Sequence, residues 1–216
     1  MKALPFALLL LLASGAAPAP SPAGDYRLTG EQDVDSGLLL QPDGQFQYFL
    51  TAGALDERAE GRWSAAGGVV ILATEPKPVP PLFELSSAAK TKSAAFKVKV
   101  SWPGGRGIAG VDLRIGLDDG VVLDGHTQED GWSLSEVESR KPRWIQLAVP
   151  MHGVRSPRFP IDLKAGNSLA FTLTPNDIGV FDFTGVRIDV TEDALVVHRD
   201  GGRLRYQAIR KIPAGR

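Results

Sequence analysis

The sequence predicts an all-β fold in two parts. Apolar and polar residues alternate along short runs, and glycine-rich turns separate these runs. The stretch Glu75–Pro81 interrupts the alternation, because its four prolines in seven residues lack backbone donors and favour an extended path. Residues 86–95, rich in small side chains, are expected to continue this linker. We therefore expect β-structure on both sides of a linker.

Residues 1–23 have the layout of a secretory signal peptide. Lys2 supplies the positive charge, Leu4–Ala13 the apolar segment, and Ser21–Ala23 the small residues of a cleavage site before Gly24. A cut after Ala16 is the alternative. The apolar segment is about half of the roughly twenty residues that a membrane-spanning helix needs. We expect an extracytoplasmic protein, periplasmic in a Gram-negative host and otherwise secreted, with no membrane span in its mature chain.

The composition narrows the classes of function. There is no cysteine, which excludes disulfides and thiolate chemistry, so stability has to come from burial. A hydrophobic content of 43% suits an ordinary globular core. The net charge of −1 gives no electrostatic signature for nucleic acid or for an anionic membrane.

About five strands are expected before the linker. Leu38–Leu40 and Phe46–Leu50 flank Gln41–Gly44, whose proline and glycine suit a tight hairpin. A second hairpin turns at Ala65–Gly68. In this region only Ala52–Glu60 is expected to hold a helical turn.

The alternation resumes after the linker, and three more strands are expected after Asp177. Together with the five early strands they make eight, a common number for a small closed barrel. We therefore expect a barrel-like antiparallel domain split between residues 24–85 and 178–216, with residues 86–177 inserted as a separate β-sandwich. Three consecutive β segments are the alternative. The later alternating runs are Phe96–Trp102, Val111–Leu117, Ile145–Val149, Leu169–Leu173, Val186–Val190, Leu195–Val197 and Leu204–Tyr206.

The middle segment resembles the carboxypeptidase regulatory-like, or transthyretin-like, domains. The residues that carry the resemblance are 106–113, Arg-Gly-Ile-Ala-Gly-Val-Asp-Leu, and 127–132, Thr-Gln-Glu-Asp-Gly-Trp. The family pattern is a strand, G-x-PLxGAxV, a hairpin and T-D-x-DG; here Ile108–Ala109 replaces Pro-Leu and Gln128 replaces the usual Asp. The resemblance covers about residues 94–175 and implies an accessory β-sandwich. More faintly, Gly61-Arg62-Trp63 resembles the Gly-x-Trp of lipocalin-like small barrels, which carry it near their first strand.

No motif predicts catalysis or a cofactor. Gly105–Gly110 fits G-x-G-x-x-G, but an alternating strand follows it instead of a helix, so we expect a turn between strands. Gly166–Ala170 approaches a nucleophile elbow and also precedes a strand. Asp112 and Asp124 could form the carboxylate pair of a glycosidase only if the fold brings them together. We predict no enzyme and no catalytic residue, and a hydrolase is the disfavoured alternative.

Metal binding is not predicted either. The acidic stretch 118–130 matches no calcium-loop spacing, and the three histidines, His126, His152 and His198, have no zinc-site spacing. The lysines at 90, 92, 97 and 99 are expected to be a solvated face.

Four tryptophans are the best candidates for binding, because indole rings offer large contact areas. Trp63 and Trp102 are expected in the core, whereas Trp132 and Trp144 adjoin polar loops and are expected to contact a protein, glycan or small ligand. The predicted function is a secreted, non-enzymatic binding or accessory module of unknown partner. The alternative is a lipocalin-type carrier of a small apolar ligand. A carrier needs a cavity inside the barrel, which would otherwise be filled by the side chains of Phe46, Tyr48, Leu50, Trp63 and Phe183.

Overall fold

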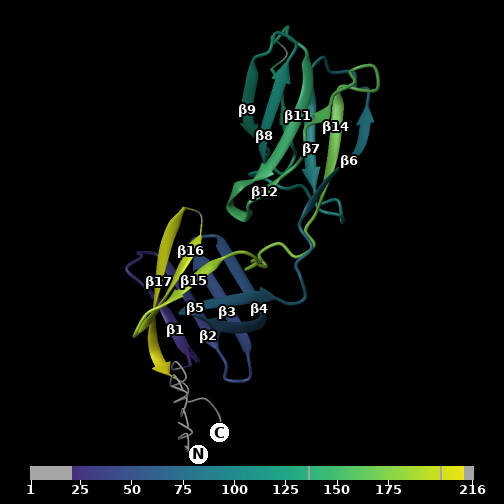
Figure 1. Cartoon of the computed structure of the whole chain (residues 1–216). Helices are drawn as coiled ribbons and strands as arrows, with labels where there is room; N and C mark the ends of the chain where they lie inside the picture. The colour runs from purple at the N-terminus through teal and green to yellow at the C-terminus, as the bar shows by residue number, and fades with distance from the viewer. Residues whose placement is uncertain (1–20, 136, 200, 212–216) are drawn as a thin grey trace, which may run out of the picture.

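The computed structural model describes residues 21–135, 137–199 and 201–211 as an all-β chain with two lobes (Figure 1). Most of the predicted signal peptide, residues 1–20, lies outside the described residues. Within them, the single helical element is a 3-10 turn, η1 (Pro150–His152). No described helix is long and apolar enough to cross a membrane.

One lobe is a closed antiparallel barrel of eight strands, which confirms the predicted barrel. Its strand order is β1-β17-β16-β15-β5-β4-β3-β2. The first and last strands of the chain close it, because β1 pairs with β17 from Gly24↔Lys211 to Thr29↔Arg205. Its strands are β1 (Gly24–Thr29), β2 (Val34–Leu40), β3 (Gln45–Ala52), β4 (Leu55–Ala66), β5 (Val69–Thr74), β15 (Arg187–Val190), β16 (Ala194–Arg199) and β17 (Gly202–Lys211).

The first hairpin forms as its turn residues require. Gly44 has φ 84° and its N–H donates to the Gln41 carbonyl, while an Asp43 carboxylate oxygen accepts from the N–H of Gln45. This confirms the predicted turn. The expected helical turn in Ala52–Glu60 is wrong. Strand β4 starts there at Leu55 and pairs with β3, so tertiary pairing decides the conformation of this segment.

The second lobe consists of two open sheets that enclose one apolar core. The first has the order β10-β7-β14-β6, and the second has the order β12-β11-β8-β9, with β13 also paired to β11. Val98, Val100, Leu113, Ile145 and Phe171 are among its fully buried residues. The strands are β6 (Leu82–Ala89), β7 (Lys97–Ser101), β8 (Asp112–Leu117), β9 (Val122–His126), β10 (Trp132–Ser133), β11 (Pro142–Val149), β12 (Val154–Arg155), β13 (Phe159–Pro160) and β14 (Ser168–Thr174).

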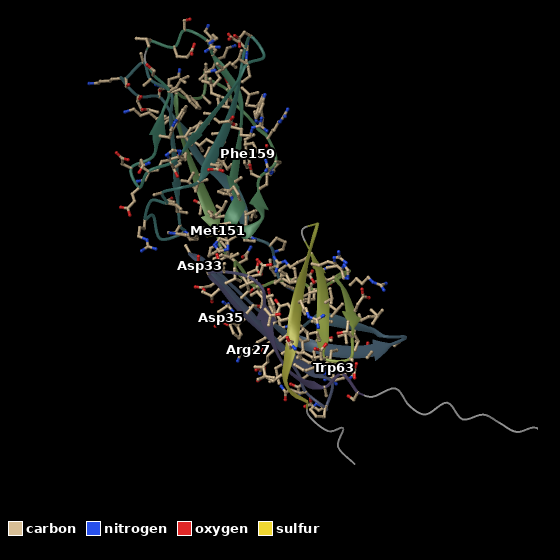
Figure 2. All side chains as sticks on the ribbon, turned by 90° about the vertical axis from the view of Figure 1, so that its left-hand side faces the viewer. Arg27, Asp33, Asp35, Trp63, Met151 and Phe159 are labelled. Carbon is tan, nitrogen blue, oxygen red and sulfur yellow. The ribbon has the colours of Figure 1, made fainter. Side chains whose placement is uncertain are left out.

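The linker is shorter than the sequence predicts. Residues 86–89 belong to β6, which pairs with β14, so the expectation of a linker over 86–95 is wrong for its first part. The connection leaving the barrel is residues 75–81, and the returning chain lies beside it. The Val79 N–H donates to Asp177 Oδ2 at 2.8 Å, and the Asp177 N–H donates to the Val79 carbonyl. In Figure 2, Met151 marks the end of the second lobe that faces the barrel, and Trp63 marks the far end of the barrel.

Candidate functional site

Trp132 occupies the open edge between the two sheets of the second lobe. It lies on β10 opposite Val98 of β7. The tight turn before it depends on Gly131, which has φ 111° and whose added Cβ would lie 2.5 Å from the Val98 carbonyl oxygen. Reciprocal backbone hydrogen bonds between Gln128 and Gly131 close that turn. The glycine therefore allows the chain to approach β7 closely enough to place the indole at the edge.

The indole rests directly on the backbone of β9. A Cβ built on Gly125 would lie 2.7 Å from Trp132 Nε1, so the absence of a side chain there makes room for the ring. The ring packs against the core and is only half-buried, so part of it faces solvent. Thr127, which lies between Gly125 and Trp132 in the sequence, is fully buried. Its hydroxyl donates to the Ile108 carbonyl and accepts from the Val111 N–H, which fixes this segment in place.

A groove of about 660 Å³ runs along the exposed side of Trp132. Its polar groups come from three separate segments of the chain. Lys97 and Lys99 project from the same side of β7, since both flank the buried Val98. The remaining polar side chains that line the groove are His126, Gln128, Asp130, Ser133 and Ser168. An aromatic ring beside several hydrogen-bonding groups is the composition of a small-ligand or glycan site.

A second groove, of about 400 Å³, lies on the other side of β9 and shares Gly125 and His126 with the first. Arg114 Nε donates to Asp124 Oδ1 at 3.2 Å across its floor. Asp112 and Asp124, considered above as a carboxylate pair, both line this groove, with Asp124 engaged by Arg114. Arg155 completes its charged lining.

Trp144 does not line either groove. It pairs with Gly116 across β11 and β8, and a Cβ on that glycine would lie 2.0 Å from the indole nitrogen. The Arg158 guanidinium carbon lies 4.0 Å from the ring centroid, a cation–π contact. The indole of Trp144 is therefore held between the strand backbone and an arginine of the same chain.

Aromatic side chains fill much of the barrel interior. Phe46, Tyr48, Leu50 and Phe183 are buried, and Phe183 makes edge-on contacts with Phe46 and Tyr48 at centroid distances of 5.6 and 4.9 Å. Trp63 is half-buried and donates its indole N–H to the Gln41 carbonyl. Trp102 is likewise half-buried against the core of the second lobe, so both tryptophans predicted as core are only partly enclosed.

A polar cluster occupies one end of the barrel interior, and no sequence motif indicates it. Arg199 and Glu57 form an ion pair there, joined by the hydroxyl of Tyr48. The Tyr206 and Ser36 hydroxyls hydrogen-bond to each other at 2.8 Å. Burial raises the pKa of Tyr48 and of Tyr206 above the ordinary tyrosine value. Every polar group of this cluster named here has a partner, which suits a structural role.

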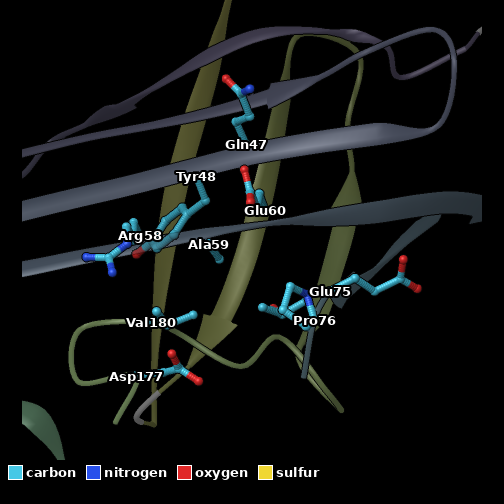
Figure 3. A pocket seen from close by; sticks show the side chains of 10 residues that line it. Gln47, Tyr48, Arg58, Ala59, Glu60, Glu75, Pro76, Asp177 and Val180 are labelled. Carbon is cyan, nitrogen blue, oxygen red and sulfur yellow. The ribbon is translucent and has the colours of Figure 1, made fainter. Parts of the chain in front are cut away.

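A side pocket of about 400 Å³ opens where the chain leaves and re-enters the barrel (Figure 3). Tyr48 and Ala59 form its inner wall, and Pro76, Asp177 and Val180 form its outer wall. The returning segment pairs with β4 in a parallel bridge at this point, because the Arg58 N–H donates to the Gly179 carbonyl and the Phe181 N–H donates to the Arg58 carbonyl.

No metal-binding group forms among the described residues. No group of three or more histidines and carboxylates there could hold a metal ion. His198 Nε2 lies 2.8 Å from Asp189 Oδ2, and hydrogen bonds from Arg187 and then His198 lower the pKa of that carboxyl. Gly105–Gly110 connects β7 to β8 without a helix, which confirms the expected turn between strands.

Sequence reasoning identified Trp132 but not the groups around it. Lys97 and Lys99 are exposed as expected. They project from the face of β7 opposite the one that Trp132 shares with Val98, and they line the groove from across the sheet edge. His126, the last residue of β9, and Gln128 lie on either side of the buried Thr127 and line the groove. No signal in a single sequence reveals the pairing of β10 with β7. No family model, curated protein or solved structure matches the chain.

Proposed function

We propose that this protein is an exported, non-enzymatic binding module whose binding site is the groove beside Trp132. The observation that carries the proposal is the half-buried indole, which lines one groove with seven polar residues from three segments of the chain. Binding sites that do not catalyse a reaction commonly combine stacking on a rigid aromatic ring with directed hydrogen bonds to the ligand. The barrel then serves as the scaffold that carries the second lobe.

The second lobe is proposed to be a transthyretin-like β-sandwich. Its two facing sheets, formed by β6–β14, support the resemblance found in residues 106–113 and 127–132. The turn at Asp130–Gly131, which the family pattern shares, is the element that positions Trp132. Fold alone does not specify activity, so the proposed binding role rests on the groove.

Export is proposed from the amino-terminal sequence. The Tyr26 hydroxyl donates to the Pro22 carbonyl at 2.7 Å and Ala23 is fully buried. Cleavage after Ala23 would remove the Tyr26–Pro22 hydrogen bond and the buried Ala23 side chain, whereas cleavage after Ala16 would keep both. Mass spectrometry of the exported protein decides between a mature terminus at Ala17 and one at Gly24. An intact Met1 on exported protein would contradict the proposal.

The binding role can be tested residue by residue with indole N–H signals in NMR spectra. The four tryptophans should give four signals, assigned with the variants Trp132→Phe and Trp144→Phe. Fractions of glycans, peptides and small molecules from the extracytoplasmic space are then added to the intact protein. We expect an active fraction to shift the Trp132 signal and leave that of Trp144 unchanged. Fractions that leave Trp132 unmoved throughout would refute the proposal.

A carrier of a small apolar ligand is the second candidate, favoured by the side pocket against Tyr48. Its volume of about 400 Å³ lies within the range of small-ligand sites, roughly 300–1,000 Å³. However, Phe183 and Phe46 occupy the barrel interior, where a lipocalin-type ligand would sit. Binding of a hydrophobic fluorescent probe to the wild type, with a Kd in the low micromolar range, would favour the carrier if Ala59→Trp abolishes that binding.

A further inference from the structure

The charges at the Trp132 groove favour an anionic ligand. Lys97 and Lys99 are two residues apart on one strand, which places their Cα atoms about 6.6 Å apart on the same side. Within the described residues, neither ammonium group has an ion-pair partner. By contrast, Arg114 and Arg140 are both paired with carboxylates. Two unpaired cations beside one acidic residue, Asp130, give the groove a net positive lining.

The uncharged groups of the groove suit a sugar. The face of a pyranose ring carries C–H bonds that pack on an indole, as Trp132 presents here. Its hydroxyl groups both donate and accept, so they match the amide of Gln128 and the carboxylate of Asp130. Ser133 and Ser168 add further hydroxyl partners on the Lys97 side of the groove.

The shape of the site indicates a chain of sugars. The two grooves meet at Gly125 and His126 and together follow β9 from one side to the other. Their volumes, about 660 and 400 Å³, exceed what one monosaccharide fills. Arg114 and Arg155 line the second groove together with the carboxylates of Asp112 and Asp124, so this groove lengthens the path without adding net charge.

We propose that these grooves bind an acidic polysaccharide, a glycan whose sugars carry carboxylates. One ring stacks on Trp132, and the glycan continues over the edge of the sheet, where carboxylates of neighbouring sugars pair with Lys97 and Lys99. This inference rests on the proposed binding function and specifies its ligand class. A nucleic acid also combines negative charge with stacking rings, but the hydrogen-bonding side chains of Gln128, Ser133 and Ser168 match sugar hydroxyl groups, and oligothymidylate serves as the competing ligand in the test.

The test uses the intact protein and four soluble polymers: polygalacturonate, dextran sulfate, neutral dextran and single-stranded oligothymidylate. Affinity is measured by calorimetry and the site is followed by the Trp132 indole signal. We expect polygalacturonate to bind most tightly and to shift Trp132. Its affinity should fall as salt rises from about 50 to 200 mM, because ion pairs are screened.

Two matched lysine pairs separate a specific site from general charge. Replacing Lys97 and Lys99 with glutamine should weaken polygalacturonate about tenfold. The same change at Lys90 and Lys92, which are exposed but lie outside the groove, should alter the affinity for polygalacturonate by no more than about twofold. Trp132→Ala, whose binding is followed by calorimetry, should weaken polygalacturonate at every salt concentration. Trp144→Phe should keep the wild-type affinity and the shift of the Trp132 signal.

Each contrary outcome has a defined meaning. Equal binding of neutral dextran, or tighter binding of dextran sulfate or oligothymidylate, overturns the carboxylated-glycan inference. If those ligands still shift Trp132, the proposed binding function stands. If none of the four polymers binds, the inference is wrong, and the extract fractions described above then decide the binding function separately. Equal losses from both lysine pairs overturn the assignment to this groove.

Discussion

Glu57 and Arg199 form a two-point ion pair inside the barrel. Arg199 Nη1 lies 2.7 Å from Glu57 Oε2, and Nη2 lies 3.1 Å from Oε1. The guanidinium also stacks on the Phe181 ring at 4.0 Å. Because β4 precedes the second lobe in sequence and β16 follows it, this pair connects the two halves of the barrel.

Removing one partner of this pair should destabilise the barrel. The two side chains are only 14% and 12% exposed, so Arg199→Met leaves the Glu57 carboxylate poorly solvated. We expect a loss of about 3 kcal/mol in the free energy of unfolding. The double variant Glu57→Leu with Arg199→Met should recover most of it. Urea unfolding followed by far-ultraviolet circular dichroism measures both.

The exposed pair Arg205–Asp193 is the matched control, with side chains 47% and 54% exposed. Asp193→Asn should change stability by no more than about 0.5 kcal/mol. If Arg199→Met behaves like this control, the interior pair contributes nothing to stability.

Gly61 should tolerate no side chain. Its φ is 152°, and a Cβ there would lie 2.0 Å from the Ala73 carbonyl oxygen, which belongs to the β5 backbone. Gly61→Ala should therefore cost roughly 3 kcal/mol, because β5 has to move. Gly67→Ala, at φ 58° with nothing within 4 Å of the added Cβ, should cost only about 1 kcal/mol. Equal urea midpoints for the two variants would contradict the steric explanation.

The alternation of Phe46, Tyr48 and Leu50 made β3 predictable, because one face of that strand is buried in the barrel and the other is exposed. Ser86–Ala89 lacks this signal. It belongs to an edge strand with exposed side chains, so its small residues resembled a linker. Periodicity thus indicates strands with one buried face and misses strands at the margin of a sheet.

The candidate site was predictable only as a single residue. Trp132 attracts attention by its type and by the Asp130–Gly131 turn before it. Its neighbours Lys97 and His126 reach it through strand register and loop packing, which a single sequence does not encode visibly. The same limit applies to Trp144, whose ring face Arg158 covers from a different segment.

Stability should decrease at alkaline pH because all three tyrosines of the chain are buried. Burial raises the pKa of Tyr26, Tyr48 and Tyr206 above the ordinary value near 10. Above about pH 10 the unfolded chain releases these protons while the folded chain keeps them, so the unfolded state is favoured as pH rises. Below that pH the contribution is fully present.

Tyrosinate absorbance can follow this titration directly. The native protein should show almost no tyrosinate signal until it unfolds, whereas the protein in urea should titrate near pH 10. Each tyrosine should contribute a slope of up to about 1.4 kcal/mol per pH unit to the loss of stability. A native titration curve centred near pH 10 would show that the hydroxyls are accessible and would contradict this account.

The barrel should need both of its chain segments, whereas the second lobe should not need the barrel. Ending the chain after Asp177 removes β15, β16 and β17, which exposes the edges of β1 and β5 and the apolar side chains that line the interior. We expect that fragment to aggregate.

In contrast, replacing residues 80–176 by a short Gly-Ser loop should leave a folded barrel, because Val79 and Asp177 are already joined by hydrogen bonds. Residues 82–174 alone should give dispersed amide signals in NMR spectra, since their two sheets enclose their own core. A monomeric, well-dispersed fragment of residues 21–85 would show that five strands suffice, and the closing role of β15–β17 would then be wrong.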